Sequence, residues 1–289
     1  MQTIVRIARA FTLLSLATAA DAQQQAADNI PVGIVEQPCP PAVTMPESVA
    51  ALQTDIFMRP HTLTPEDGSK LTGSAEFRQY LGALRQMGNR DWPALCRFNA
   101  DNARLKAAGT RPQLVFMGDS ITENWLLGDA ELFNDNNVNR GIGGQTTPQM
   151  LLRFRADVVA LRPAAVHILA GTNDIAGNTG PSTVDDFKNN VMSMVELAQA
   201  NNIKVLLGSI PPTATFSWAP AIAPAPRVSE LNAWLREYAV QKNLVYIDYH
   251  TALAGPAGEL RSELGNDGVH PNRDGYVIMR RLLEQALAQ

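Results

Sequence analysis

The sequence has few cysteines, no excess of positive charge, and no long apolar run after its first residues. Cysteine occurs twice, at Cys39 and Cys96, and neither the number nor the spacing of these residues indicates a metal site. The formal net charge is −4, and Lys and Arg are scattered, which argues against nucleic acid as a partner. No later stretch approaches the ~20 apolar residues that cross a bilayer, so no membrane span is expected.

The first 22 residues have the composition of a secretory leader. Arg6 and Arg9 supply a positively charged start, and a stretch of small and apolar residues runs from Ala10 to Ala20. The tripeptide Ala-Asp-Ala that ends at Ala22 fits the small-x-small rule for cleavage. We therefore expect a signal peptide over residues 1–22 and a secreted or periplasmic protein. A short amphipathic helix is the alternative, and a lipid anchor is not indicated because no cysteine follows the cleavage site.

The segment between the leader and residue 110 predicts an extension followed by helices. Residues 23–65 are rich in Gln, Ala and Pro, which favours an irregular extension. Residues 66–110 are expected to form helices that pack on the core, one over 74–87 and one from Asp91, a candidate N-cap, through Ala108. In an exported chain Cys39 and Cys96 would form one disulfide, and two free thiols are the alternative.

Residues 111–289 alternate between short apolar runs and segments of helical periodicity. The expected strands are Leu114–Met117, Asn137–Arg140, Ala164–Ala170, Lys204–Ile210 and Leu244–Tyr249. Such alternation builds βαβ crossovers and a parallel sheet. We therefore expect one α/β domain, a flavodoxin-like three-layer α/β/α sandwich with a five-stranded parallel sheet, preceded by the N-terminal extension. With 289 residues, 45% of them hydrophobic, the chain can form one sizeable core.

Four of the expected strands are followed by polar or glycine-rich loops. These loops are Gly118-Asp119-Ser120, Gly141-Ile142-Gly143-Gly144, Gly171-Thr172-Asn173-Asp174 and, some residues after the last strand, Asn266 to Asn272. The carboxyl ends of parallel strands meet at one edge of a sheet, and ligands bind at that edge in open α/β sheets. The four loops are therefore expected to converge there, although they lie far apart in the sequence.

The converging loops carry the groups that nucleophilic acyl transfer needs. Ser120 is the expected nucleophile, and it needs a base because a serine hydroxyl is a poor nucleophile. His270 is the expected base. Asp267, three residues earlier, is expected to fold back and hold the imidazole in the right tautomer. The backbone N–H groups of Ser120 and Gly144 and the side chain of Asn173 are the expected oxyanion donors.

Other histidines and carboxylates have simpler interpretations. Asp248 and His250 could form a rival acid–base pair, but a structural pair at a strand end is the preferred reading. His167 lies inside an apolar run and is expected to be a core residue, and His61 has no identifiable partner. Asp119 and Asp174 are expected to organise their loops by accepting hydrogen bonds from backbone amides.

Two tryptophans are candidates for substrate contact. Trp125 follows the serine by about one helical turn, a position that also suits a core side chain. Trp218 lies in the Pro- and Ala-rich loop after the fourth strand, which borders the same edge of the sheet. We expect both to contact substrate.

The four loops resemble the conserved blocks of the SGNH hydrolases, also called the GDSL esterase/lipase family. The residues that give the family its name correspond to Ser120, Gly144, Asn173 and His270. Ile121 stands where the family often has Leu. The second block is similar to the Gly-Ile-Gly-Gly-x-Thr-Thr form of platelet-activating-factor acetylhydrolase-like and acetyl-esterase members, and the last is similar to Asp-x-x-His. The resemblance covers about residues 110–289.

The resemblance implies a flat, solvent-open site without cofactor or metal. It implies an exported serine esterase that hydrolyses carboxylic esters through an acyl-enzyme. Short acyl chains are expected, including O-acetyl groups on carbohydrate, so the partner would be a small-molecule or glycan ester. An acyltransferase on the same scaffold and a non-catalytic carbohydrate- or envelope-binding protein are the alternatives.

Overall fold

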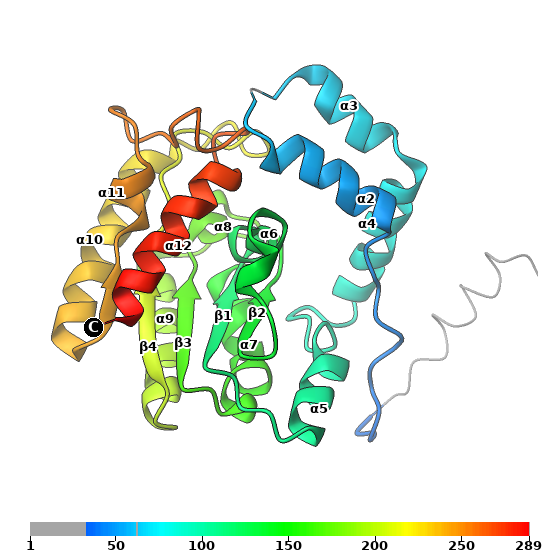
Figure 1. Ribbon diagram of the computed structural model, residues 1–289, viewed down its shortest axis with the longest axis vertical. Coiled ribbons are helices and arrows are strands. Elements are labelled where there is room, and N and C mark those ends of the chain that lie inside the picture. The colour runs from blue at the N-terminus through cyan, green and yellow to red at the C-terminus, as the bar shows by residue number, and fades with distance from the viewer. Residues whose placement is uncertain (1–32, 62, 289) are drawn as a thin grey trace, which may run out of the picture. The chain divides into compact units, whose positions relative to one another are not determined.

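The structure is a computed structural model that describes residues 33–61 and 63–288. The chain divides into two compact units, residues 1–41 and 42–289. In the first unit the described residues 33–41 form bends and coil. The second unit contains a parallel sheet with helices around it (Figure 1). The predicted signal peptide, residues 1–22, and the first part of the predicted extension lie outside the described residues.

Five parallel strands form the sheet, as the sequence predicts. They are β1 (Leu114–Gly118), β2 (Asn137–Gly141), β3 (Ala165–Leu169), β4 (Lys204–Gly208) and β5 (Val245–Ile247). Their order is β2-β1-β3-β4-β5. The register places Gly118 opposite both Gly141 and Leu169, so the three neighbouring strands β2, β1 and β3 end at the same level. The loops that follow these strands therefore start side by side.

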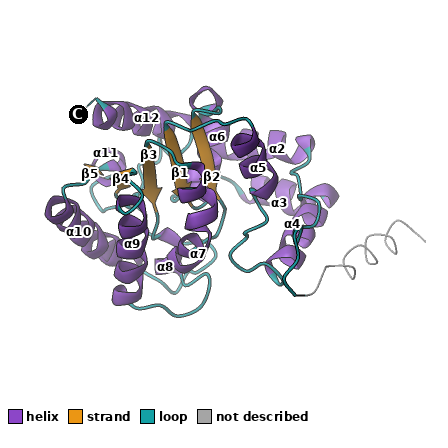
Figure 2. Cartoon of the chain, turned by 90° about the horizontal axis from the view of Figure 1, so that it is seen from below, coloured by secondary structure: helices purple, strands orange, loops and turns teal. Residues whose placement is uncertain are grey.

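Helices cover both faces of the sheet, which gives the expected three layers (Figure 2). One face carries α7 (Thr147–Asp157), α9 (Val184–Gln199) and α10 (Pro224–Lys242), and the other carries α6 (Ser120–Gly128), α11 (Tyr249–Leu253) and α12 (Arg273–Leu287). Side chains alternate along β1: Val115 and Met117 pack with the first set of helices, and Leu114 and Phe116 with the second, since successive strand residues point to opposite faces. The short elements are α8 (Thr172–Ala176), η2 (Ala130–Leu132) and η3 (Val159–Leu161).

The prediction of an irregular extension is wrong for residues 47–58, which are helical. They form α2 (Glu47–Gln53) and the π-helix η1 (Thr54–Met58), and α3 (Pro65–Gly73) and α4 (Ala75–Gly88) follow. Two of the prolines that suggest irregular chain lie at helix starts: Pro46 is the N-cap of α2, and Pro65 begins α3. Proline is tolerated there because the N–H it lacks has no partner within the helix.

The helix expected over 91–108 is shorter in the structure, where α5 spans Asn99–Ala107. The Asp91 carboxylate accepts the N–H groups of Leu95 and Cys96, and Ala94 has a φ of +58°. This left-handed residue interrupts a helix that would otherwise begin at Asp91. The aspartate caps a turn instead.

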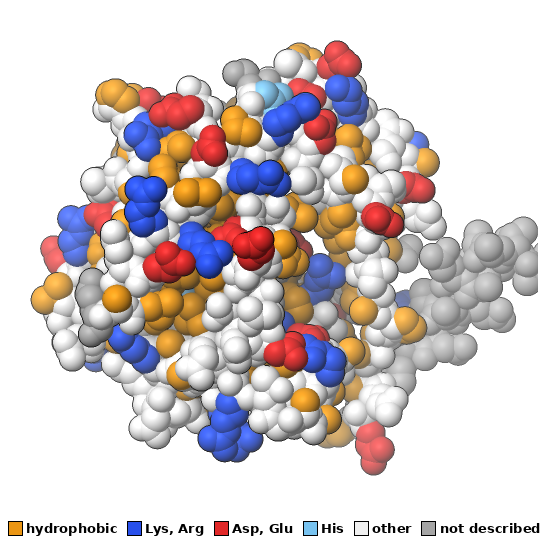
Figure 3. Space-filling view, viewed as in Figure 1, with side chains coloured by type: hydrophobic (Ala, Val, Ile, Leu, Met, Phe, Trp, Pro, Cys, Tyr) orange, Lys and Arg blue, Asp and Glu red, His pale blue; other side chains and the backbone are white. Residues whose placement is uncertain are grey.

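Both cysteines, Cys39 and Cys96, are disulfide-bonded rather than free thiols, in agreement with the expected disulfide. None of the helices in the described residues combines the length and apolar character that a bilayer crossing needs. Basic and acidic side chains are interspersed on the face shown in Figure 3, in line with the scattered charges of the sequence.

Candidate active site

Ser120 is the first residue of α6, and only Asp119 separates it from Gly118 at the end of β1. Asp119 is the N-cap, and its carboxylate accepts the N–H of Ile121 at 2.9 Å. Gly118 has no room for a side chain, because a Cβ there would lie 2.0 Å from Thr122 Oγ1 and 2.8 Å from the Leu169 carbonyl oxygen. The strand and the helix therefore meet in a tight turn that presents Ser120 at the edge of the sheet.

A series of hydrogen bonds connects Ser120, His270 and Asp267. Ser120 Oγ lies 2.8 Å from His270 Nε2, and His270 Nδ1 lies 2.6 Å from Asp267 Oδ2. The other Asp267 oxygen accepts the backbone N–H groups of Val269 and His270. The carboxylate is thereby held in place by the loop on which the histidine stands. This arrangement can transfer a proton from the serine to the imidazole.

The charge of Asp267 controls the protonation of His270. Burial by itself lowers the pKa of His270, but the charge and hydrogen bond of Asp267, with a smaller contribution from Asp119, outweigh burial and raise that pKa above its usual value. Burial likewise raises the pKa of Asp267, but the interaction with His270 and two backbone N–H groups leaves it below its usual value. Asp267 is therefore ionised near neutral pH, and it stabilises an imidazolium at His270.

The glycine-rich loop after β2 lies against the serine. A Cβ on Gly143 would be 3.7 Å from Ser120 Cβ, and the Gly143 N–H donates to Glu123 at 2.8 Å. Gly144 is exposed and has a φ of +78°, a conformation that favours glycine. Within the described residues, the backbone N–H groups of Ser120 and Gly144 have no acceptor, so both are available to a ligand.

The side chain of Asn173, at the start of α8, is hydrogen-bonded on both of its atoms. Its Nδ2 is 3.2 Å from Asp119 Oδ2 and 3.1 Å from the Gln145 carbonyl oxygen. Its Oδ1 accepts from Asn178 Nδ2 at 2.7 Å, which orients the amide group towards Asp119. The two acceptors lie at the long end of hydrogen-bond distances, so the Asn173 amide can be shared with a third acceptor.

Asp119 is a fully buried carboxyl group beside Ser120 and Asn173. Burial raises its pKa to about 7, and nearby Asp174 acts in the same direction, whereas the Ile121 N–H and His270 oppose the shift. Asp174 accepts the N–H of Thr147 at 3.1 Å. Both carboxyl groups thus organise their loops through backbone amides, as the sequence predicts.

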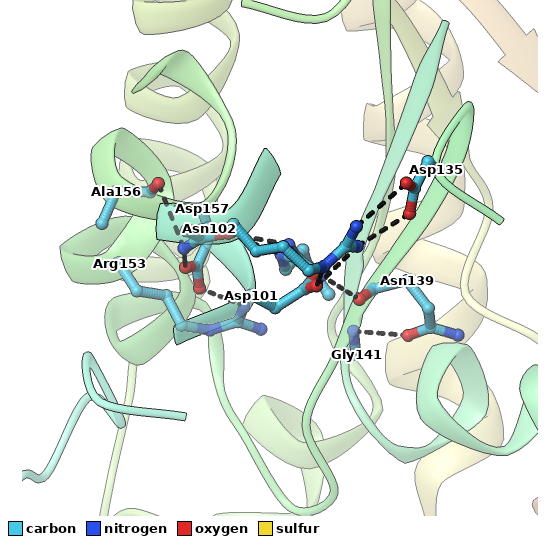
Figure 4. Close-up of polar contacts among 10 residues, drawn as sticks. Asp101, Asn102, Asp135, Asn139, Gly141, Arg153, Ala156 and Asp157 are labelled. Carbon is cyan, nitrogen blue, oxygen red and sulfur yellow. Dashed lines mark hydrogen bonds and ion pairs between the residues drawn. The ribbon is translucent and has the colours of Figure 1, made fainter. Parts of the chain in front are cut away.

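A buried polar network lies behind these loops (Figure 4). Arg153 of α7 pairs with Asp157 at 3.0 Å and donates to Gln145 Oε1 at 2.6 Å and to the Gly118 carbonyl oxygen at 3.1 Å. Asn102 of α5 donates to the other Asp157 oxygen at 2.7 Å. Arg153 is therefore in direct contact with both loops that border Ser120.

Comparison with known proteins assigns the chain to a family. The sequence profile of the GDSL-like Lipase/Acylhydrolase family matches residues 116–278. The chain belongs to this family. The resemblance expected from the four blocks is confirmed, and the chain is an ester-hydrolysing enzyme of the GDSL-like type.

Solved structures of similar sequence cover the same region. A protein described as an acylhydrolase from Bacteroides fragilis is 43% identical with a TM-score of 0.65, over 68% of this chain and 97% of that one. A GDSL-like lipase from Bacteroides thetaiotaomicron is 41% identical with a TM-score of 0.65, over 68% of this chain and 98% of that one. The Bacillus subtilis lipoprotein YqeF is 36% identical over 112 residues, which are 32% of this chain and 46% of that protein. The chain thus matches about half the length of this curated relative.

Trp125 does not line the site of this GDSL-like hydrolase, so that prediction is wrong. Its side chain is fully buried and packs against the rings of Phe116 and Tyr276. Five residues along a helix correspond to a rotation of about 140°. Trp125 therefore points into the core, whereas Ser120 faces the edge of the sheet.

Trp218 remains beside the site. It is 44% exposed, and its indole N–H donates to Asn178 Oδ1 at 3.0 Å. Asn178 in turn binds Asn173 and, at 3.4 Å, the Gly144 carbonyl oxygen. The sequence predicted neither the position nor the contacts of Asn178, because an asparagine in a turn has many possible roles.

The carboxylate of the rival pair at the end of β5 has structural partners. Asp248 pairs with Arg236 at 2.5 Å and caps α11 by accepting the N–H of Thr251. His167 is buried, as expected: its Nε2 is 3.1 Å from the Tyr249 hydroxyl, and burial lowers its pKa to about 3. His61 has a partner that the sequence did not indicate, since its Nε2 lies 3.5 Å from Asp67.

The N-terminal π-helix borders the histidine loop, which the sequence did not predict. Asn266 Nδ2 donates to the carbonyl oxygens of Ile56 and Arg59 at 2.8 and 2.7 Å. The Phe57 ring lies edge-on to the His270 ring, with centroids 6.1 Å apart. Residues that precede the matched family region therefore help to shape the site. Within the described part of the chain, no group of three or more His, Cys, Asp or Glu side chains is arranged to hold a metal ion.

Proposed function

We propose that this chain is an exported serine esterase that removes short acyl groups from carboxylic esters, including O-acetyl groups on carbohydrate. The observation that carries the proposal is the continuous hydrogen-bonded series from Ser120 Oγ through His270 to Asp267, at 2.8 and 2.6 Å. A serine, a neutral imidazole and a carboxylate in this order form the machinery of acyl transfer by covalent catalysis.

Each member of the triad has one role in the reaction. Ser120 Oγ attacks the ester carbonyl while His270 Nε2 takes its proton. Asp267 stabilises the imidazolium, which then donates the proton to the departing alcohol and leaves an acyl-enzyme on Ser120. Water, deprotonated by His270, attacks the acyl-enzyme and releases the carboxylic acid.

Three donors are proposed for the oxyanion of each tetrahedral intermediate. The N–H groups of Ser120 and Gly144 are available, and Asn173 Nδ2 supplies the third by sharing its bond to the Gln145 carbonyl oxygen. The bond from Asn178 to Asn173 Oδ1 keeps the Nδ2 group, rather than the oxygen, on the side of the reacting atoms. Asn178 therefore acts as a positioning residue.

Asn178→Ala is expected to lower kcat for p-nitrophenyl acetate by about tenfold with little change in KM. The loss is smaller than the ~10²–10³-fold that removal of an oxyanion donor costs, because Asn173 remains present but is less well oriented. Steady-state kinetics measure the effect. Trp218→Phe keeps the ring and removes the N–H to Asn178, so a smaller loss is expected. An unchanged kcat in Asn178→Ala would show that Asn173 needs no such support.

Two observations support a short acyl group and a carbohydrate ester. The Gly-Ile-Gly-Gly-Gln-Thr-Thr block at residues 141–147 resembles the form of platelet-activating-factor acetylhydrolase-like and acetyl-esterase members. The fold is shared with an acetyl-xylooligosaccharide esterase from Geobacillus stearothermophilus, which is 20% identical with a TM-score of 0.50 over 61% of this chain and 94% of that one.

Export is supported by three independent features. The first 22 residues read as a leader, both cysteines are disulfide-bonded, and such bonds persist in oxidising compartments. The Bacillus subtilis relative is a lipoprotein. We therefore place the enzyme outside the cytoplasm, after cleavage near Ala22.

Hydrolysis of p-nitrophenyl esters from acetate to palmitate tests the proposal. The wild-type enzyme is expected to cleave the acetate and butyrate esters and to lose activity as the chain lengthens. Ser120→Ala is expected to lower kcat by at least about 10⁴-fold, since the covalent step is lost. Ser229→Ala, an exposed serine of α10, is the matched control and should retain full activity. Activity that persists in Ser120→Ala would refute the assignment of the nucleophile.

A further inference from the structure

A cavity of about 300 Å³ lies beside the glycine-rich loop. Its walls include Trp92, Thr146, Thr179, Asp186, Asn189 and Asn190. These residues come from the segment before α5, from the start of α7, from the loop after α8 and from the start of α9. Both α7 and α9 begin at the carboxyl edge of the sheet, where Ser120 also lies. The cavity and the serine therefore share one edge of the molecule.

The wall of the cavity is continuous with the oxyanion loops. Thr146 follows Gly144 by two residues, and its Oγ1 lies 2.8 Å from Thr179 Oγ1. Thr179 directly follows Asn178, which bonds to both Asn173 and the Gly144 carbonyl oxygen. A substrate whose acyl group is at Ser120 can therefore extend its alcohol part along this wall.

Trp92 is held by its backbone, and its side chain remains accessible. Its carbonyl oxygen accepts from Gln149 Nε2 at 2.7 Å, and the carbonyl oxygen of Pro93 accepts from Gln145 Nε2 at 3.0 Å. The side chain itself is 46% exposed. A large, exposed aromatic ring that stands on a fixed backbone and lines a polar cavity is a contact surface for a ligand.

The residues that line the cavity indicate a neutral, hydroxyl-rich ligand. Among the described residues of the lining there is no Lys or Arg, and the two carboxylates are Asp174 and Asp186, so an anion would meet only like charge. The Asp186 carboxylate already accepts a hydrogen bond from the Thr183 hydroxyl. Asn189 is exposed, and its carboxamide has no partner in the described part of the chain. A long acyl chain would require continuous apolar walls, which these amides and hydroxyls do not offer.

We propose that this cavity is a subsite for a neutral sugar unit of the ester's alcohol part, with the ring stacked on Trp92 and its hydroxyls bonded to Asn189, Asn190 and the threonines. Cleavage of a sugar ester at this subsite rests on the proposed esterase function, whereas binding of the sugar does not. Trp92 lies in the turn between α4 and α5, which precedes the region matched by the family profile, residues 116–278, so this subsite includes a residue from outside that region.

Two substrates with the same acyl group test the subsite. Trp92→Ala is expected to lower kcat/KM on acetylated xylotetraose by about tenfold, because an aromatic contact with the sugar is lost. Asn189→Ala is expected to lower it by less, because a single hydrogen bond is lost. The value for p-nitrophenyl acetate, which has no sugar, is expected to stay unchanged. Val277→Ala, an exposed position on α12, is the control. Equal losses on both substrates, or no loss on either, would overturn the proposal.

Binding of unmodified oligosaccharides separates the subsite from the chemistry. Ser120→Ala is titrated calorimetrically with xylotetraose, cellotetraose and chitotetraose, and with a tetramer of galacturonate as the anionic control. At least one neutral tetramer is expected to bind, and its affinity is expected to fall about tenfold when Trp92→Ala is added. This result would support the subsite even if the wild-type enzyme cleaved no ester. Failure of all neutral tetramers to bind, or stronger binding of galacturonate, would overturn it.

Discussion

Asp267→Asn is expected to lower kcat/KM for p-nitrophenyl acetate by about 10³–10⁴-fold while the fold is retained. The Asn oxygen can still accept the N–H groups of Val269 and His270. Its NH₂ group then faces His270 Nδ1, where a carboxylate oxygen lies at 2.6 Å in the native enzyme. A donor at this position favours the tautomer with the proton on Nε2. That nitrogen is 2.8 Å from Ser120 Oγ and could no longer accept the serine proton.

The same substitution is expected to move the acid limb of the pH profile. The base must be neutral, so kcat/KM falls as the pH drops through the pKa of His270. In the native enzyme burial lowers this pKa, but the charge and hydrogen bond of Asp267, together with the charge of Asp119, outweigh burial and raise it, which places the limb above the usual His pKa of about 6.5. Without that charge the pKa falls, so the remaining activity of Asp267→Asn should persist to lower pH.

Rate measurements from about pH 5 to 9 on both enzymes check the two effects together. Asp248→Asn is the matched control, because Asp248 is the carboxylate of the rival pair and binds Arg236. It should leave both the rate and the pH profile unchanged. A loss of less than tenfold in Asp267→Asn, or an acid limb that does not move, would mean that another group orients His270.

The sheet and the residues around Ser120 could be predicted because their signals are local. Strands buried on both faces read as apolar runs, so β1 was located to within one residue. The loops that carry Ser120, Gly144 and Asn173 directly follow strands, and the ends of parallel strands must meet at one edge. Asp267 and His270 lie on a single short loop, so their pairing required no knowledge of the tertiary fold.

The features that could not be predicted depend on contacts between distant segments. Whether Trp125 faces the core or the site depends on how α6 rotates against the sheet, and the tryptophan suits either environment. The bonds from Asn266 to the π-helix and to its C-cap Arg59 join residues that are more than 200 positions apart, and no periodic pattern marks them. The helices over residues 47–58 could not be predicted, because proline is typical both of irregular chain and of the first turn of a helix.

Arg153→Met is expected to lower the free energy of unfolding by about 3–5 kcal/mol. Arg153 and Asp157 are fully buried, and their 3.0 Å ion pair compensates for the removal of both charges from water. Without the arginine, the hydrogen bond from Asn102 is the one that the Asp157 carboxylate keeps among the described residues. The Gly118 carbonyl oxygen and the Gln145 side chain also lose their donor. Urea denaturation followed by circular dichroism measures the loss.

The double variant Arg153→Met/Asp157→Leu distinguishes an uncompensated charge from lost packing. Replacement of both partners removes the isolated carboxylate, so most of the stability should return. Arg155→Met is the control, because Arg155 is exposed on the same helix and should change stability by less than about 0.5 kcal/mol. If the double variant were no more stable than Arg153→Met, the arginine would stabilise the enzyme through Gly118 and Gln145. Its main role would then be to support the loops beside Ser120, and the ion pair would contribute little.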